Sequence, residues 1–158
     1  MSRSGRAVVG AIALLATGLL VTRPATPSGV AEAEEQVRTA ERAFARTMAD
    51  RDHEAFASFV SEEAVFLGPA ALRGRAAVAA GWKAYFDEEQ APFSWEPESV
   101  VALASGQLAL SSGPVYGPDG NRIGTFNSTW RLEQDGRWRV VFDHGCPPCD
   151  CGTSSGEE

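Results

Sequence analysis

The chain has few basic groups, little cysteine and no long apolar run, and each scarcity excludes a class of protein. Its 14 Lys and Arg face 21 Asp and Glu, for a net charge of −7. With no basic patch to neutralise phosphates, nucleic acids and anionic membranes are excluded as partners. The uncharged apolar run at residues 7–21 has fifteen residues, fewer than the roughly 20 that span a bilayer.

That short run has the features of a secretory signal peptide. Arg3 and Arg6 precede it, and Gly29 and Ala31 provide small residues at the spacing that a signal peptidase recognises. We therefore predict a cleaved signal peptide at residues 1–31 and export to the periplasm or outside a bacterial cell. The alternative is a retained membrane anchor, which the shortness of the run disfavours. After cleavage we expect no membrane attachment.

The three cysteines all lie in a polar tail at residues 146–158, which we expect to be unstructured. Because their number is odd, one of Cys146, Cys149 and Cys151 is unpaired or bonded to another chain. Thiols with this spacing also suit zinc or copper(I), so a metal-binding tail stays open as an alternative. A local disulfide with one spare thiol is favoured, since no second ligand cluster is found elsewhere in the sequence.

The segment between leader and tail, residues 32–145, reads as one α+β domain. Its pattern predicts an amphipathic helix at residues 32–50, a helix at 53–60 capped by Asp52, a strand at 64–67 and a helix at 74–86. From residue 93 the apolar period becomes two. This predicts strands at 93–104, interrupted at Pro97, and at 107–116, followed by a hairpin at 121–145.

The hairpin fixes which side chains share a face. Taking Asp135-Gly136 as a two-residue type I′ turn pairs residues whose numbers sum to 271. We expect an inward face and an outer face, the inward one with Phe126, Ser128, Trp130, Val141 and Asp143, and the outer one with Trp138, Val140 and Phe142. Three large apolar groups on an outer face suggest a protein contact. The alternative is that the two faces are inverted.

A polar row crosses the inward face. Continuing the register through the Asp119-Gly120 turn pairs Ser111 with Ser128, which itself lies opposite Asp143. His144 follows Asp143 but points to the opposite face, since side chains alternate along a strand. A Ser-His-Asp triad is therefore excluded by this register.

The order α-α-β-α-β-β-β-β, with the segments RDHEAFASFVSEEAVFLGP, LRGRAAVAAGW and TWRLEQDGRWRVVFDHG, resembles the nuclear transport factor 2-like superfamily. Within it, the chain is similar to the SnoaL-like group and to exported proteins of domain of unknown function 4440. The resemblance implies a cone, in which a curved antiparallel meander wraps around the helices and leaves an apolar pocket at its open end. It also implies that a second copy of the chain is a partner, because relatives often form homodimers.

Members of the superfamily include ketosteroid isomerases, and the resemblance allows that chemistry to be tested by position. The isomerase base falls on Gly68, its tyrosine on Phe44 and its protonated acid on Ser128. Proton abstraction beside a carbonyl needs all these roles filled, so a steroid-isomerase activity is excluded.

One candidate site remains. Asp143 is its acid/base or its polar anchor, and the ligand-binding residues are expected to be Ser111, Ser128, Trp130, Phe126 and Trp82. A purely structural Asp143, satisfied by hydroxyl and backbone donors, is the competing interpretation.

We therefore expect an exported, homodimeric protein that binds a small apolar or amphipathic molecule and needs no cofactor. A lyase or isomerase that uses Asp143 as acid/base and a dimeric assembly module are the two alternatives. The sequence does not decide whether the protein is an enzyme.

Overall fold

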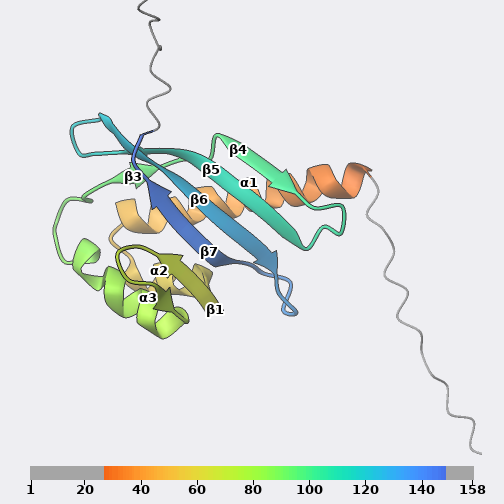
Figure 1. Cartoon of the computed structure of the whole chain (residues 1–158), viewed down its shortest axis with the longest axis horizontal. Helices are drawn as coiled ribbons and strands as arrows, with labels where there is room; N and C mark the ends of the chain where they lie inside the picture. The colour runs from red at the N-terminus through yellow and green to blue at the C-terminus, as the bar shows by residue number, and fades with distance from the viewer. Residues whose placement is uncertain (1–26, 149–158) are drawn as a thin grey trace, which may run out of the picture.

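The computed structural model describes residues 27–148 (Figure 1). Its first element is the long helix α1, Pro27–Ala49, which begins five residues before the start expected from the sequence. Its apolar stripe is buried as expected, with Val37, Phe44 and Met48 at most 1% exposed. None of the helices in the described part of the chain is long and apolar enough to cross a membrane.

The second and third helices lie on either side of the first strand along the chain. Helix α2, His53–Phe59, is capped as predicted, since the Asp52 carboxylate accepts the Ala55 N–H at 2.9 Å. Strand β1, Val60–Leu67, follows directly, and the two-residue strand β2, Leu72–Arg73, pairs with its end. Helix α3, Arg75–Trp82, continues into the short 3₁₀ helix η1, Lys83–Phe86, over the predicted range.

The remaining strands form the curved sheet that lies over α1 (Figure 1). They are β3, Ser94–Trp95; β4, Ser99–Ala102; β5, Leu108–Tyr116; β6, Arg122–Leu132; and β7, Trp138–Cys146. The predicted break at Pro97 is confirmed, because β3 and β4 both pair with β5 on either side of it. The connection passes so close to Gly113 that a Cβ there would lie 2.0 Å from the Glu96 carbonyl oxygen.

The described sheet is mixed, with strand order β2-β1-β7-β6-β5-β3 and β4 also on β5. β5, β6 and β7 form the expected antiparallel meander, whereas β1 joins β7 in parallel. This parallel pair places Phe66 beside Asp143. The fold is the predicted α+β cone, with helices on one side of a sheet that does not close.

The hairpin turn differs from the predicted one. A type I′ turn needs positive φ at both central residues, but of this pair only Gly136 has one, at 77°. The Gly136 N–H donates to the Glu133 carbonyl, which makes a longer loop with the glycine in the left-handed position. From Thr125 to Thr129 of β6, the number of each residue and the number of its β7 partner still sum to 271. Trp130 instead pairs with Val140, so Val141 is an extra residue in β7.

This bulge corrects the predicted faces. Between the bulge and the turn the side chains of β7 are reversed, so Trp138 and Val140 belong to the core and not to the outer face. The Trp138 indole donates to the Gln36 side chain of α1 at 2.9 Å. Beyond the bulge the prediction holds, since Phe142 is 53% exposed on the outer face and Asp143 points inward.

Candidate functional site

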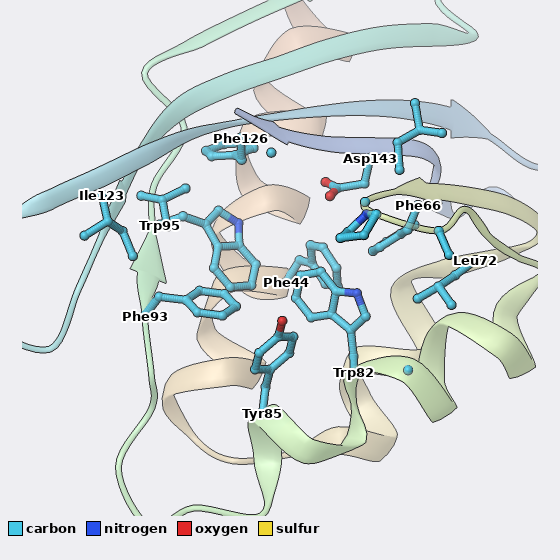
Figure 2. Close-up of a pocket in the computed structure, with 17 residues that line it drawn as sticks. Phe44, Phe66, Leu72, Trp82, Tyr85, Phe93, Trp95, Ile123, Phe126 and Asp143 are labelled. Atoms are coloured by element: carbon cyan, nitrogen blue, oxygen red, sulfur yellow. The ribbon is translucent and has the colours of Figure 1, made fainter. Parts of the chain in front are cut away.

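A cavity of about 400 Å³ opens at the end of the cone where β1, β6 and β7 face α3 and η1. Figure 2 shows aromatic rings on several sides of it, with the Asp143 carboxylate reaching in from above. The aromatic wall residues are Phe44, Phe66, Trp82, Tyr85, Phe93, Trp95 and Phe126. The cavity is thus apolar, and within its described lining Asp143 is the one carboxylate.

Asp143 reaches the cavity because of its place on β7. It follows the bulge, so its side chain points to the helix side while Phe142 and His144 point outward. The Ser128 hydroxyl donates to one carboxylate oxygen, Oδ2, at 2.8 Å. Burial raises the pKa of Asp143 to about 6, and the Ser128 hydrogen bond opposes part of that rise.

The polar row predicted across three strands is present. Ser111 pairs with Ser128 and Ser128 with Asp143, as the predicted strand register requires. Ser111 and Ser128 are at most 1% exposed, however, and neither lines the cavity. Of the expected ligand-binding residues, Phe126 and Trp82 line the cavity, whereas Trp130 lies fully buried behind it with the two serines.

A second acid, Glu41, lies behind the wall and was missed by the sequence reasoning. It is fully buried on α1, and its two oxygens accept the indole N–H groups of Trp95, at 2.8 Å, and Trp130, at 2.7 Å. Burial raises its pKa to about 7; the two indoles and Ser111 lower it, and the Asp143 charge raises it further. The Ser111 hydroxyl makes no hydrogen bond of ordinary geometry within residues 27–148.

A sequence signal for Glu41 did exist. Val37, Glu41, Phe44 and Met48 follow one another at helical spacings of four, three and four, so Glu41 lies on the apolar stripe of α1. An acid at such a position must be paired or satisfied by donors.

The open side of the cavity is built from edge-to-face aromatic pairs. Trp82 and Tyr85 lie 5.5 Å apart between ring centroids, and Tyr85 and Phe93 lie 5.3 Å apart, at interplanar angles of 79° and 74°. Figure 2 shows the Tyr85 hydroxyl turned toward the interior, across from Asp143. Tyr85 is 43% exposed, so this residue stands at the mouth of the cavity.

The positions compared with the isomerases gather around this same cavity. Phe44 and Gly68 line it, and Ser128 holds the Asp143 carboxylate. The geometry therefore places an acid near these positions, but on β7 instead of at any of them. Asp143 could bind a polar group of a ligand or exchange a proton with it through its second oxygen, Oδ1.

Residues near the end of β7 show no metal arrangement in the described chain. His144 is exposed on the outer face. The Cys146 thiol lies 3.7 Å from the Thr125 carbonyl oxygen, which it faces as a donor. Within residues 27–148, no three His, Cys, Asp or Glu side chains are grouped to hold a metal ion. The predicted tail ligands Cys149 and Cys151 lie outside the described residues, as does most of the predicted signal peptide.

Comparisons with known proteins agree with this fold. The model of the SnoaL-like domain family matches residues 40–141, and none of the curated proteins matches the chain. A nuclear transport factor 2-like protein of unknown function from Pseudomonas putida is 20% identical, with a TM-score of 0.63; the match covers 80% of this chain and 94% of that one.

Two further solved structures are similar at the same level. A protein of unknown function from the DUF3225 family of Pectobacterium atrosepticum is 18% identical, with a TM-score of 0.63 and coverage of 78% of this chain and 98% of that one. A candidate dehydratase of the nuclear transport factor 2-like family from Streptomyces avermitilis is 20% identical, with a TM-score of 0.60 and coverage of 77% and 98%. These likenesses show the fold, and the family match shows that this chain belongs to the SnoaL-like domain family.

Proposed function

We propose that this SnoaL-like domain binds a small, largely apolar molecule in the open end of its cone, with Asp143 as the polar anchor. One observation carries the proposal: a single half-buried carboxylate enters an otherwise apolar cavity of about 400 Å³. Cavities of this kind, with a few polar groups on apolar walls, are typical of small-molecule sites. Ser128 fixes the carboxylate through Oδ2 and so leaves Oδ1 for a ligand.

Filling the cavity tests this proposal directly. Gly145 lines the cavity, and a Cβ added there meets nothing within 4 Å, so Gly145→Phe adds a ring without a backbone clash. The matched control is His144→Phe, which adds the same ring on the opposite, exposed face. We expect small molecules that co-purify with the folded protein, identified by extraction and mass spectrometry, to be lost from Gly145→Phe and kept in the control.

Retention of the same molecules by Gly145→Phe at wild-type stoichiometry would place the ligand elsewhere and contradict the proposal. Because Trp82 and Trp95 are wall residues, added ligands are also expected to change the tryptophan emission of the wild-type protein. The same titration of Gly145→Phe is expected to leave the emission unchanged.

A second candidate function is acid/base catalysis, as in a lyase or isomerase. It is favoured by the pKa of Asp143, which burial brings to about 6, near the pH at which proton exchange with a substrate is efficient. With a substrate in hand, Asp143→Asn is expected to abolish turnover while binding persists. Asp50→Asn, an exposed acid paired with Arg46 on α1, is the control. Unchanged turnover in Asp143→Asn would rule out this function.

Homodimerisation through the outer sheet face is a further part of the proposal. Val101 lies opposite Leu110, and the row continues through Thr129 to Phe142. Val101, Leu110 and Phe142 are 59%, 47% and 53% exposed, so three strands present apolar side chains in this row, with Thr129 of β6 between Leu110 and Phe142. We expect sedimentation to show a dimer that Phe142→Glu converts to a monomer. A wild-type monomer at high concentration would contradict it.

Export of the chain also stays a proposal, since it rests on residues 1–31 of the sequence. Expressed with its leader in a bacterium, the protein is expected in the periplasmic or extracellular fraction. N-terminal sequencing is expected to find Glu32 as the first residue. A cytoplasmic protein that keeps its leader would contradict the prediction.

A further inference from the structure

The ionisable groups around the cavity are of one sign. Its 17 lining residues include the carboxylate of Asp143 and the phenol of Tyr85, but no Lys, Arg or His. At neutral pH Asp143 is mostly ionised, and its apolar surroundings penalise that charge. A half-buried charge without an ionic partner among the described residues favours whatever can neutralise it. A cation entering the cavity would remove this penalty.

The walls add to the attraction for a cation. Trp82, Tyr85, Phe93 and Trp95 surround the open side of the cavity at different orientations, and Figure 2 shows them below and beside the Asp143 carboxylate. Phe93 lies 6.0 Å from Trp82 at an interplanar angle of 82°, and 6.0 Å from Trp95 at 39°. Aromatic faces carry a negative potential, and several faces around one space are the arrangement that holds organic ammonium groups.

The elements behind the walls contribute a second acid. Glu41 of α1 bonds to the far side of the Trp95 indole, and the repulsion between Glu41 and Asp143 raises the pKa of Glu41. Two bases on neighbouring segments are engaged with other groups. Arg51 donates to the Met48 and Tyr85 carbonyl oxygens, with its guanidinium over Phe86, and His53 bonds the Ala79 carbonyl oxygen. Among the described residues, no base lines the cavity to compete with a cationic ligand.

We infer that the ligand of this cavity is a small apolar organic amine, whose ammonium group pairs with Asp143 Oδ1 and whose apolar body lies against the aromatic walls. The inference rests on the proposed binding function and names its ligand class. It excludes carboxylates such as fatty acids, because their charge would face Asp143 and the aromatic faces without a compensating base. The volume of about 400 Å³ limits the ligand to a small molecule.

The test compares probes with one apolar body and different head groups. 1-Naphthylmethylamine, 1-naphthylmethanol and 1-naphthoic acid are titrated into the full chain by calorimetry at about pH 7.5. We expect the amine to bind at least about tenfold more tightly than the alcohol, and the acid more weakly than both. In Asp143→Asn the amine is expected to lose its advantage over the alcohol. Asp50→Asn is the matched control and keeps the advantage.

The wild-type protein provides a second arm that needs no variant. Between about pH 8 and pH 5 Asp143 and Glu41 both gain protons, so the ratio of amine to alcohol affinity is expected to fall toward one. Binding of the alcohol is expected to change little over the same range.

The outcomes separate the inference from the function on which it rests. If the alcohol or the acid binds the wild-type protein as tightly as the amine, the ammonium inference is overturned while the apolar binding function stands. If none of the three binds at millimolar concentration, both are contradicted. An advantage for the amine that persists in Asp143→Asn and at pH 5 would overturn the role of Asp143.

Discussion

The closed and open parts of the cone each hold an inward acid, and the two acids are satisfied in different ways. In the closed part Glu41 is fully buried and both of its oxygens accept an indole N–H. In the open part Asp143 has one donor, Ser128, and its other oxygen is left to the cavity. A carboxylate with both oxygens occupied organises the core, whereas one with a spare oxygen is available to a ligand.

The largest effect on stability is expected from a substitution of Glu41 in the closed part. Glu41→Ala leaves the Trp95 and Trp130 indole N–H groups without acceptors and opens a cavity, so we expect a loss of about 4 kcal/mol in the free energy of unfolding. Urea denaturation followed by tryptophan emission measures it. Glu41→Gln, which keeps one acceptor oxygen, is expected to lose about half as much. A loss below about 1 kcal/mol in Glu41→Ala would show that the indoles do not need this acid.

The second prediction concerns how the stability of the protein depends on pH through Glu41 and Asp143. The pKa values of Glu41 and Asp143 are raised to about 7 and about 6, so the folded protein binds protons that the unfolded chain releases. This stabilisation is complete below about pH 4 and is lost as the pH rises through about 6 to 7. We expect each acid to account for up to about 3 kcal/mol of that loss.

Thermal denaturation between about pH 5 and pH 8 checks this slope, which Glu41→Gln and Asp143→Asn should each reduce. Asp135 titrates at the other end: Arg139 lowers its pKa to about 2, so its contribution is lost only in strong acid. Stability that rises from pH 5 to pH 8 would contradict the raised pKa values.

Asp143→Asn is expected to change the free energy of unfolding in the opposite direction to the Glu41 substitutions. At about pH 8 the ionised Asp143 costs stability, and asparagine removes the charge while it can still accept the Ser128 hydroxyl. We expect a gain of about 1 to 2 kcal/mol in urea denaturation, as often occurs where a functional group is strained. The gain should vanish at about pH 5. A loss at both pH values would indicate a structural role for Asp143.

Ser128→Ala is expected to have the smallest effect. It removes the one described donor to Asp143, so the pKa of that carboxyl should rise further above its usual range. We expect a destabilisation of about 1 kcal/mol, and the titration is measurable by NMR of the labelled carboxyl carbon. Thr129→Ala, on the opposite face of β6, is the control and should leave the titration unchanged. An unaltered pKa would mean that Ser128 does not tune the acid.

The pairing of residues between neighbouring strands could be predicted from the sequence. The β-bulge, which depends on one extra residue in β7, could not. The pairs Ser111–Ser128 and Ser128–Asp143 follow from alternation, and the structure confirms them. The turn chemistry of Asp135-Gly136 did not reveal a bulge at Val141, so Trp138 and Val140 were assigned to the wrong face. Nothing in the Val-Val-Phe sequence marks which residue is left over.

The site could be predicted only in part, for a related reason. Asp143, Phe126 and Trp82 lie where alternation and the helical stripe placed them. Tyr85, Phe93 and Trp95 join the wall through η1 and the short strand β3, whose positions depend on tertiary packing. Glu41 was detectable as an acid on an apolar stripe, but its two indole partners come from residues 54 and 89 positions away.

The extra residue Val141 separates β7 into two stretches, and the inward side chains of the two stretches have different roles. From Trp138 to Val140 the strand is bound to the core and to Gln36, so changes there act on folding. From Asp143 onward its inward residues, Asp143 and Gly145, line the cavity. A substitution in one stretch can therefore leave the other stretch in place. The ligand preference of this strand can change while its packing in the core stays the same.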